Sequence, residues 1–381
     1  MATVRELADE ARERMLDDLT RYIEFETPSD DLEALAAGLA WVRSWLTERL
    51  GAPEAERTVD GGDFGDIAVL DWGLDAPGRI AVLCHYDTVW PMGTLADWPV
   101  AIDGDQLTGP GAFDMKAGLV QFVWAVRIAR EAGLPVPGFR LILNGDEEIG
   151  SPASRPVIEE AVAGYDAALV FEASAEGRLK TARKGVGIYE VVVHGVEGHA
   201  GLDPEKGVSA IDEIARIVRT LHDAADLSAG TSVNVGTLQG GSRSNVTAGR
   251  ASATVDVRVA DEAEQRRIDD VFARLQPAHE DARLEVRGGW NRPVMLRSDG
   301  TAALFQAAQE AARAVGIEVE EISVGGASDG NFVAALGIPV LDGLGAVGDG
   351  AHARHEWISI SGMVERTALA AALLGRLSSE R

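Results

Sequence analysis

Apolar residues near the N-terminus recur with the spacing of amphipathic helices, which predicts helices over residues 4–25 and 32–50. Helical side chains three or four positions apart lie on one face, so these residues form a stripe that can pack on a core. In the first helix the stripe consists of Leu7, Ala11, Met15, Leu16 and Leu19.

Three short apolar runs follow, and each ends in residues with useful chemistry. They are Arg79–Cys84 before His85, Phe139–Leu143 before Asn144–Glu148, and Ala167–Phe171 before Glu172. A helical pattern lies between the first two runs, over Ala117–Ala132. Strands alternating with helices predict an α/β domain whose mixed, largely parallel sheet is flanked by helices. Ligands bind at the carboxyl ends of strands in such sheets, which is where these polar residues fall.

Near residue 185 the pattern changes to the order β-α-β-β-α-β, the split arrangement of a ferredoxin-like α+β domain. The expected elements are Ile188–His194, Val208–Leu221, Ser232–Leu238, Ala251–Val259, Ala263–Leu275 and Leu284–Arg287. Helix–strand alternation then resumes, with a helix over Thr301–Val315 and a buried strand over Ile338–Leu341. We therefore expect a catalytic domain in two parts, residues 1–184 and 296–381, interrupted by a second domain over 185–295.

Composition narrows the class of protein. The chain has 381 residues, 46% hydrophobic and 25% charged, as expected for a globular enzyme of two domains. Its formal net charge of −26 repels nucleic acid and anionic membranes, so neither is an expected partner. An anionic substrate must therefore be held by local basic groups or by metal.

The chain also lacks several sequence signals. Cys84 is the only cysteine, which excludes a disulfide within the chain, and its apolar surroundings predict a core residue. Residues 1–7 break their apolar positions with charges and contain no signal-peptide core. No uncharged run approaches the length of a membrane span. These features predict a soluble, cytoplasmic protein.

The first candidates for chemistry are His85, Asp87 and Asp114. Side chains two positions apart in extended chain point the same way, so Asp87 can accept the proton of one ring nitrogen of His85 and leave the other for a metal. A plain structural hydrogen bond is the alternative. Asp114 lies between the glycine-rich segment Gly109–Gly111 and a helix, where it can be either a helix N-cap or a metal-bridging carboxylate.

Further acids and a late imidazole extend this set. Consecutive acids such as Asp146–Glu148 usually form a solvated turn, but their side chains diverge, so one can bind metal while its neighbour faces a water. Glu172 follows an apolar run, where a buried charge needs a partner, and His352 supplies the second imidazole. With His85 and Asp114 they make a nitrogen–oxygen site suited to zinc, and a shared carboxylate is typical of co-catalytic two-metal hydrolases.

An ordered set of motifs covers nearly the whole chain, and through it the sequence resembles a known family. The motifs are His85–Val89, Gly109–Gly111, Asp114–Gly118, Asp146–Ser151, Phe171–Glu172, Gly198–Gly201 and Gly325–Asp329. They are similar to those of the zinc-dependent carboxypeptidase G, aminoacylase and acetylornithine deacetylase metallopeptidase family, closest to its glutamate carboxypeptidase branch. The resemblance implies a zinc-peptidase-like catalytic domain with an inserted lid and dimerisation domain, and hence a homodimer.

The resemblance also implies roles for the candidate residues. The implied metal ligands are His85 and Glu172 for one zinc ion, Glu148 and His352 for the other, and Asp114 as the bridge between them. Asp87 would orient His85, Glu147 would be the general base, and the peptide bond after Asp114 would be cis. The family's metal histidine stands four residues before a glutamate, as His352 does before Glu356. His355 is the alternative ligand.

In the inserted domain, the resemblance implies that His199 reaches the active site of the partner subunit and stabilises the oxyanion. Asn245 and Arg258 fall at positions linked to substrate binding, as does Gly326 in the predicted substrate pocket. Arg292 resembles the arginine that holds the substrate carboxylate, with a solvated loop arginine as the alternative.

These roles predict hydrolysis of an amide or peptide bond next to a free C-terminal carboxylate, by metal-activated water with Glu147 as base. The substrate would be an N-acyl amino acid or a short peptide. An N-acyl or N-acetyl amino acid deacylase would use the same site. A non-catalytic metal- or ligand-binding protein on the same fold is the alternative from another class, which loss of Glu147 would have favoured. Cobalt or manganese could replace zinc, because carboxylate-rich sites admit both.

Overall fold

The computed structural model describes residues 2–379 and contains two compact units. The first consists of the chain up to Ala182, Leu296–Val324 and the chain from Ser328 onwards. The second consists of Arg183–Met295 together with the short segment Gly325–Ala327. The sequence pattern instead places this segment in the second part of the catalytic domain, residues 296–381. Within residues 2–379, no helix combines the length and apolar character needed to cross a membrane.

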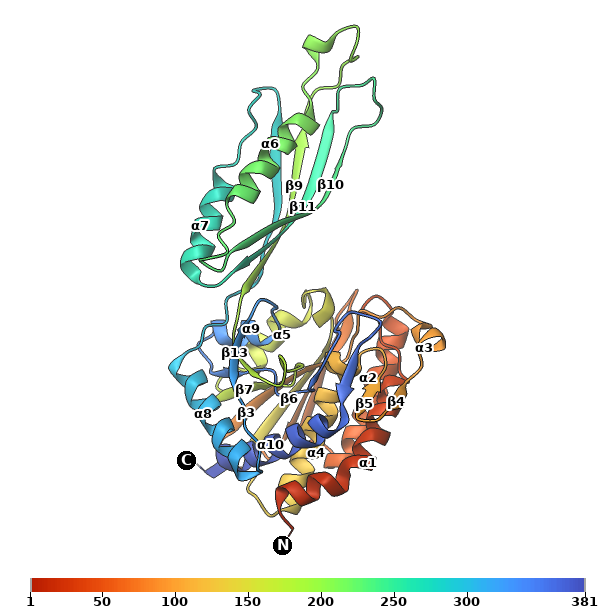
Figure 1. Ribbon diagram of the computed structural model, residues 1–381, viewed down its shortest axis with the longest axis vertical. Coiled ribbons are helices and arrows are strands. Elements are labelled where there is room, and N and C mark those ends of the chain that lie inside the picture. Colours follow the sequence, from red (N-terminus) through yellow and green to blue (C-terminus); the bar gives the residue numbers. More distant parts are fainter. Residues whose placement is uncertain (1, 380–381) are drawn as a thin grey trace. The chain divides into compact units, whose positions relative to one another are not determined.

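The first unit is built on a six-stranded sheet in the order β1-β2-β6-β3-β7-β14 (Figure 1). The strands are β1 Ala55–Val59, β2 Gly65–Trp72, β3 Arg79–His85, β6 Gly138–Gly145, β7 Ala167–Val170 and β14 Val340–Leu341. β6, β3, β7 and β14 are parallel, whereas β2 is antiparallel to both of its neighbours. The predicted mixed, largely parallel sheet is therefore confirmed.

Helices cover both faces of this sheet. One face packs on α1 Val4–Ile23, α2 Leu32–Leu50, α4 Ala117–Glu131, α8 Asp299–Ala314 and α10 Ile360–Ser379, and the other carries α5 Ser154–Ala161 and α9 Gly330–Ala335. The helices begin where side chains cap their free N–H groups: Thr3 and Glu6 form a capping box on α1, and Asp31 caps α2. The apolar stripe predicted on the first helix is buried in the core.

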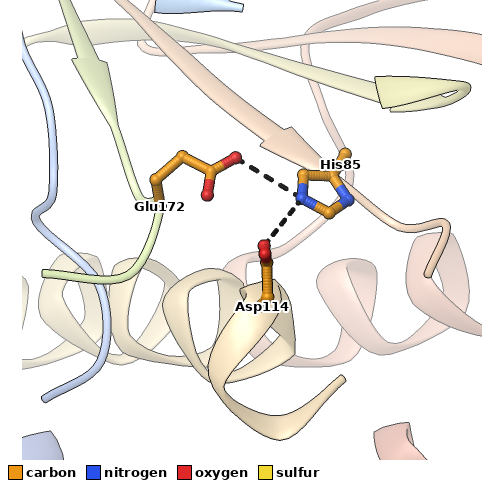
Figure 2. Close-up of side chains that lie close together, drawn as sticks. All are labelled: His85, Asp114 and Glu172. Atoms are coloured by element: carbon orange, nitrogen blue, oxygen red, sulfur yellow. Dashed lines mark hydrogen bonds and ion pairs between the residues drawn. The ribbon is translucent and has the colours of Figure 1, made fainter. Parts of the chain in front are cut away.

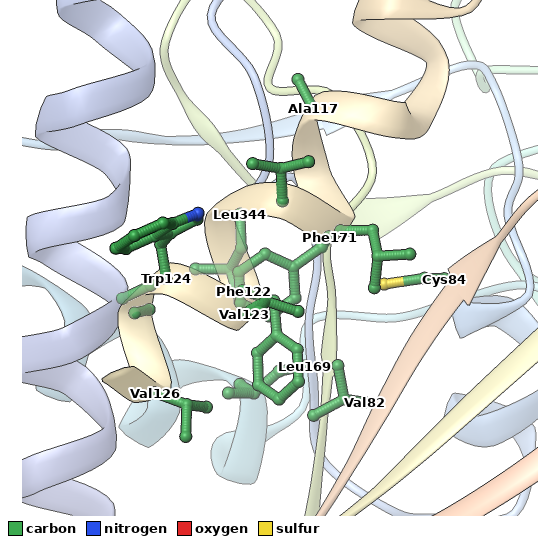
Figure 3. Packing of buried hydrophobic residues seen from close by; sticks show 14 of the residues in the cluster. Val82, Cys84, Ala117, Phe122, Val123, Trp124, Val126, Leu169, Phe171 and Leu344 are labelled. Atoms are coloured by element: carbon green, nitrogen blue, oxygen red, sulfur yellow. The ribbon is translucent and has the colours of Figure 1, made fainter. Parts of the chain in front are cut away.

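Figure 3 shows part of the core beneath the helical face, to which every second residue of β3 belongs. Val82 and Cys84 of β3 point into the cluster around Phe122 of α4, whose ring centroid lies 5.1 Å from that of Phe171. Cys84 is buried and makes the predicted contribution to the core. Because packing fixes the length and position of each strand, it also fixes where the polar residues at the strand ends are placed.

The second unit contains β9 Gly185–His194, α6 Ala210–Asp223, β10 Ser232–Gly240, β11 Arg250–Val259, α7 Glu262–Ala273 and β12 Arg283–Arg292. Its strands form one antiparallel sheet in the order β10-β11-β9-β12. The first and third strands are thus central, which is the ferredoxin-like arrangement expected from the sequence. A separate apolar cluster lies between this sheet and its helices.

The predicted end of the last strand in this unit was wrong. The sequence suggests a strand over Leu284–Arg287, but β12 continues to Arg292. Gly288 and Gly289 interrupt the apolar alternation because they have no side chains, although their main chain keeps pairing with β9. The ladder then passes an irregularity between Trp290 and Arg292.

The first unit also contains several short strands, which the apolar pattern does not predict. β8 Leu179–Arg183 pairs with β13 Glu321–Val324, and a small sheet has the order β15-β16-β5-β4. The strands of this sheet are β4 Ala101–Asp103, β5 Gln106–Thr108, β15 Gly348–Asp349 and β16 Trp357–Ser359. Strands of two or three residues are too short to show a period. They nevertheless position two loops of the candidate site.

Candidate metal centre

His85 ends β3, and its ring meets two carboxylates that come from distant parts of the chain (Figure 2). Its Nε2 lies 3.3 Å from Oδ1 of Asp114 and 3.4 Å from Oε1 of Glu172. Glu172 follows β7, the parallel neighbour of β3, so both residues emerge at the same edge of the sheet. The three side chains each offer one ligand atom, and these atoms lie within 4.8 Å of one another.

A second group of the same kind shares Asp114 with the first. Nε2 of His352 lies 3.0 Å from Oε2 of Glu148 and 3.4 Å from Oδ2 of Asp114. Asp114 therefore presents one oxygen to each imidazole. The structure brings together all five side chains that the sequence proposes as metal ligands, in two groups that share one carboxylate.

The electrostatics of these groups show how strongly the residues influence one another. Burial alone would lower the pKa of His85, but Asp114, Asp87 and Glu172 together raise it well above its ordinary value. The carboxylates of Asp114 and Glu148 raise the pKa of His352 to about 10. These side chains thus form one cluster whose ionisable groups strongly influence one another.

The carboxylate of Glu148 is buried in surroundings that favour a bound cation. Burial, followed by repulsion from the carboxylate of Asp114, raises its pKa to about 7. Its side chain is 5% exposed, and its Oε1 is buried without a hydrogen-bond partner among residues 2–379. A buried carboxylate oxygen with no donor is costly unless a cation neutralises it. The donor set of two imidazoles and three carboxylates fits divalent zinc.

Asp87 connects His85 to the acidic turn after β6. Nδ1 of His85 lies 3.0 Å from the main-chain oxygen of Asp87 and 3.3 Å from its Oδ1. The same carboxylate accepts the main-chain N–H of Glu147 at 3.3 Å and of Glu148 at 3.2 Å. Ser29 donates a further hydrogen bond of 2.7 Å. Asp87 therefore contacts the ring nitrogen of His85 that does not face Asp114 and Glu172.

Glu147 and Glu148 are adjacent but occupy different environments. Both lie in the short helical turn Glu147–Ile149, and Glu147 is half-buried and belongs to neither ligand group. Asp146 shapes the turn by accepting the main-chain N–H groups of Ala153 and Ser154 at 2.8 and 3.1 Å. As expected for adjacent acids, only one of the two side chains, that of Glu148, belongs to a ligand group. The role of Glu147 as base stays a prediction.

The helix-cap interpretation of Asp114 is wrong. The residue at the cap position of α4 is Lys116, and Asp114 has the extended dihedral angles φ −118° and ψ 98°. Its carboxylate faces the two imidazoles instead. The peptide bond between Asp114 and Met115 is cis, as the resemblance implies.

The structure favours His352 over His355 as the second imidazole. His352 has φ +62°, a left-handed conformation that is uncommon for any residue with a Cβ atom and that occurs frequently at functional sites. Its ring contacts Glu148 and Asp114. His355 is exposed and belongs to neither ligand group in the described chain.

The predicted substrate residues all lie in the second unit. His199 and Asn245 are exposed on adjacent segments, because the main-chain oxygen of Asn245 accepts the N–H of Ala200 at 3.1 Å. Nδ1 of His199 accepts the main-chain N–H of Leu202 at 3.0 Å. Their roles toward substrate stay predictions.

Two of the predicted residues lie close together elsewhere in that unit. Arg258 pairs with Asp256 through two hydrogen bonds of 2.8 and 2.9 Å and reaches the main-chain oxygen of Gly325 at 3.4 Å. The oxygen of the neighbouring Gly326 accepts a hydrogen bond of 3.2 Å from Arg183. Arg292 ends β12 and is buried, so the alternative of a solvated loop arginine is wrong.

Sequence reasoning missed several residues around the site. The sequence points to Glu356 only through its spacing from His352. In the structure Glu356 is fully buried and hydrogen-bonded to the loop that carries Asp114. Ser29 contacts Asp87, and Asp329 accepts hydrogen bonds from Asn144 and Ser151. The sequence does not show these contacts, because each of the partners is more than 50 positions away.

Fold and site together are those of a metal-dependent hydrolase. The chain belongs to peptidase family M20/M25/M40, whose sequence pattern matches residues 81–376. Carboxypeptidase G2 from Pseudomonas sp. (strain RS-16) is 28% identical over 368 residues, which cover 93% of this chain and 87% of that protein. Succinyl-diaminopimelate desuccinylase from Shewanella piezotolerans is 28% identical over 316 residues, with coverage of 77% and 81%.

The fold is also shared with solved structures. The Bacillus subtilis YXEP protein, described as a dinuclear metal binding peptidase from the M20 family, superposes with a TM-score of 0.64. It is 18% identical and the match covers 98% of this chain and 99% of that one. At this identity the likeness concerns the fold.

Proposed function

We propose that this protein is a two-zinc hydrolase that cleaves an amide or peptide bond next to a free C-terminal carboxylate, in the manner of a glutamate carboxypeptidase. The observation that carries the proposal is the pair of ligand groups sharing Asp114. The similarity to carboxypeptidase G2 over 93% of the chain supports the carboxypeptidase reaction. The substrate would be an N-acyl amino acid or a short peptide.

The five clustered side chains would hold two divalent cations: His85 and Glu172 one of them, Glu148 and His352 the other, and Asp114 both. When bound, the cations supply Lewis acidity that lowers the pKa of a water and polarises the substrate carbonyl. Glu147 accepts the proton of that water and passes it to the leaving nitrogen. Asp87 holds the ring of His85 in its ligand orientation.

The remaining roles concern the substrate. Arg292 would bind its free carboxylate, which a chain of net charge −26 otherwise repels. Arg258, Asn245 and Gly326 would line the pocket, and His199 would stabilise the developing oxyanion in the partner subunit. A homodimer and a cytoplasmic location accompany this proposal as predictions.

A deacylase acting on N-acyl amino acids is the second candidate, and the desuccinylase relative favours it. The two reactions share the metal centre and differ in the acyl group and the amino acid. The presence of Glu147 argues against a protein that binds metal without catalysis. Cobalt and manganese are chemically reasonable substitutes for zinc.

The decisive experiment measures metal content and hydrolysis of N-acyl-glutamate substrates, alongside N-acetyl-ornithine and N-succinyl amino acids. Two zinc ions per chain and glutamate release that a chelator abolishes and zinc restores would support the carboxypeptidase. Preference for the acetylated or succinylated substrates would support the deacylase. Protein without metal under zinc saturation would overturn both.

A further inference from the structure

Glu356 is a fully buried carboxylate that has no role in the hydrolysis proposed above. It lies in the loop 350–356 between β15 and β16, four residues after His352. This loop closes tightly. Gly350 has φ +86°, and a Cβ atom there would lie 2.9 Å from Cα of Glu356. The positions of Glu356 and His352 are therefore coupled through a short, compact loop.

Four hydrogen bonds link this carboxylate to other segments. Oε1 of Glu356 accepts the main-chain N–H of Phe113 at 2.8 Å and of Asp114 at 3.0 Å. Its Oε2 accepts the main-chain N–H of Gly111 at 3.1 Å and the indole N–H of Trp90 at 2.9 Å. Every acceptor direction of the carboxylate is engaged, and three of the donors belong to the loop that carries Asp114.

The small sheet explains why these two loops meet. β5 leads into the Asp114 loop, and β16 follows the His352 loop. The two strands are antiparallel neighbours, with Thr108 opposite Trp357. Both loops therefore leave the sheet at the same end, and Glu356 joins them just beyond it.

We propose that Glu356 is a positioning residue for the ligand group of Asp114, Glu148 and His352. It fixes the main chain of Asp114 through hydrogen bonds and the position of His352 through their shared loop. His85, in contrast, pairs with Asn144 in the β3–β6 ladder, and Glu172 lies two residues beyond β7, where its main-chain oxygen accepts the N–H of Gly345 at 2.9 Å. Loss of the Glu356 carboxylate weakens one metal site more than the other. This inference rests on the proposed function, because it requires two metal ions.

The test is calorimetric titration of zinc into metal-free wild type and Glu356→Gln. Glutamine keeps the shape but turns an NH₂ group toward two donors. We expect two tight sites in wild type. In the variant we expect one site to be about 10- to 100-fold weaker, the usual effect of losing a residue that supports a ligand, and the other to lose clearly less affinity. At intermediate zinc, kcat should fall while KM stays unchanged, and excess zinc should restore kcat.

Two further variants make the result specific. Trp90→Phe removes one of the four hydrogen bonds and should weaken the same site less, which keeps the inference testable if Glu356→Gln does not fold. Glu213→Gln is the matched control, because Glu213 is a buried carboxylate that accepts the main-chain N–H groups of Ala278 and His279 in the second unit. It should leave both zinc affinities unchanged.

The possible outcomes distinguish the positioning role of Glu356 from the proposed two-zinc function. Two sites of wild-type affinity in Glu356→Gln, or an equal loss of both sites, would overturn the positioning role and leave the proposed function intact. Wild type that binds no zinc would overturn the proposed function, and the positioning role with it.

Discussion

The carboxylate of Asp87 accepts the main-chain N–H of Glu148 at 3.2 Å, and its Oδ1 lies 3.3 Å from Nδ1 of His85. One buried residue thus links ligands of both proposed metal sites. It also fixes the turn that carries Glu147, whose main-chain N–H lies 3.3 Å from the same carboxylate. Metal affinity and the position of the base are therefore expected to depend on a single side chain.

Replacing Asp87 by Asn tests this link. The amide replaces one carboxylate oxygen by an NH₂ group, so at least one side-chain hydrogen bond to the turn is lost, while the main-chain contact with His85 remains. We expect zinc affinity to fall about 10- to 100-fold, measured by competition with a coloured chelator. Ser29→Ala removes only one donor to Asp87 and should have a smaller effect. Equal zinc affinity in wild type and Asp87→Asn would contradict the link.

Glu147→Gln separates catalysis from metal binding. Because Glu147 lies outside both ligand groups, the variant should keep its zinc content. Loss of the proton acceptor should lower kcat about 10²- to 10⁴-fold, measured by amino acid release under saturating substrate. Glu176→Gln, at an exposed position, serves as the control. A variant that retains wild-type kcat would exclude Glu147 as the base.

Gly118→Ala tests the close packing behind Glu172. A Cβ atom at position 118 would lie 1.9 Å from the main-chain oxygen of Phe171, so the start of α4 must move away from β7. We expect the free energy of unfolding to fall by about 1–3 kcal/mol, measured by urea denaturation. Gly236→Ala is the matched control, because a Cβ atom there meets only a side-chain nitrogen of Asn234 at 3.6 Å. Similar loss in both variants would show that the contact with Phe171 is unimportant.

Tyr189 should make the stability of the second unit sensitive to alkaline pH. Burial, with a smaller effect of Asp269, raises its pKa from 10.0 to about 12. As the pH rises from about 10, the unfolded chain loses this proton first, so unfolding becomes more favourable until the folded residue ionises near 12. Tyr189→Phe should reduce the fall in the free energy of unfolding over this range, measured by denaturation at each pH. An identical pH dependence in both proteins would exclude Tyr189 as a contributor.

The sequence by itself determined that the candidate site residues stand at the ends of buried strands. Apolar runs before His85, Asp146–Glu148 and Glu172 predict parallel strands, because buried strands show as continuous apolar segments. The carboxyl ends of such strands meet at one edge, so the sequence alone places these residues in one group. The ferredoxin-like order of the second unit followed in the same way from alternating and helical periods.

Only the tertiary structure decided the contacts between those residues. His352 and His355 lie in one short loop, and only the three-dimensional structure shows that the imidazole of His352, at 3.0 Å, is the one that faces Glu148. The sequence predicted β12 only as far as Arg287, since Gly288 and Gly289 have no side chains to continue the alternation to Arg292. Glu356 and Asp114 are 242 positions apart, and their hydrogen bond depends on the pairing of two three-residue strands. Periodicity describes local burial, whereas such long-range pairing is set by the packing of the whole unit.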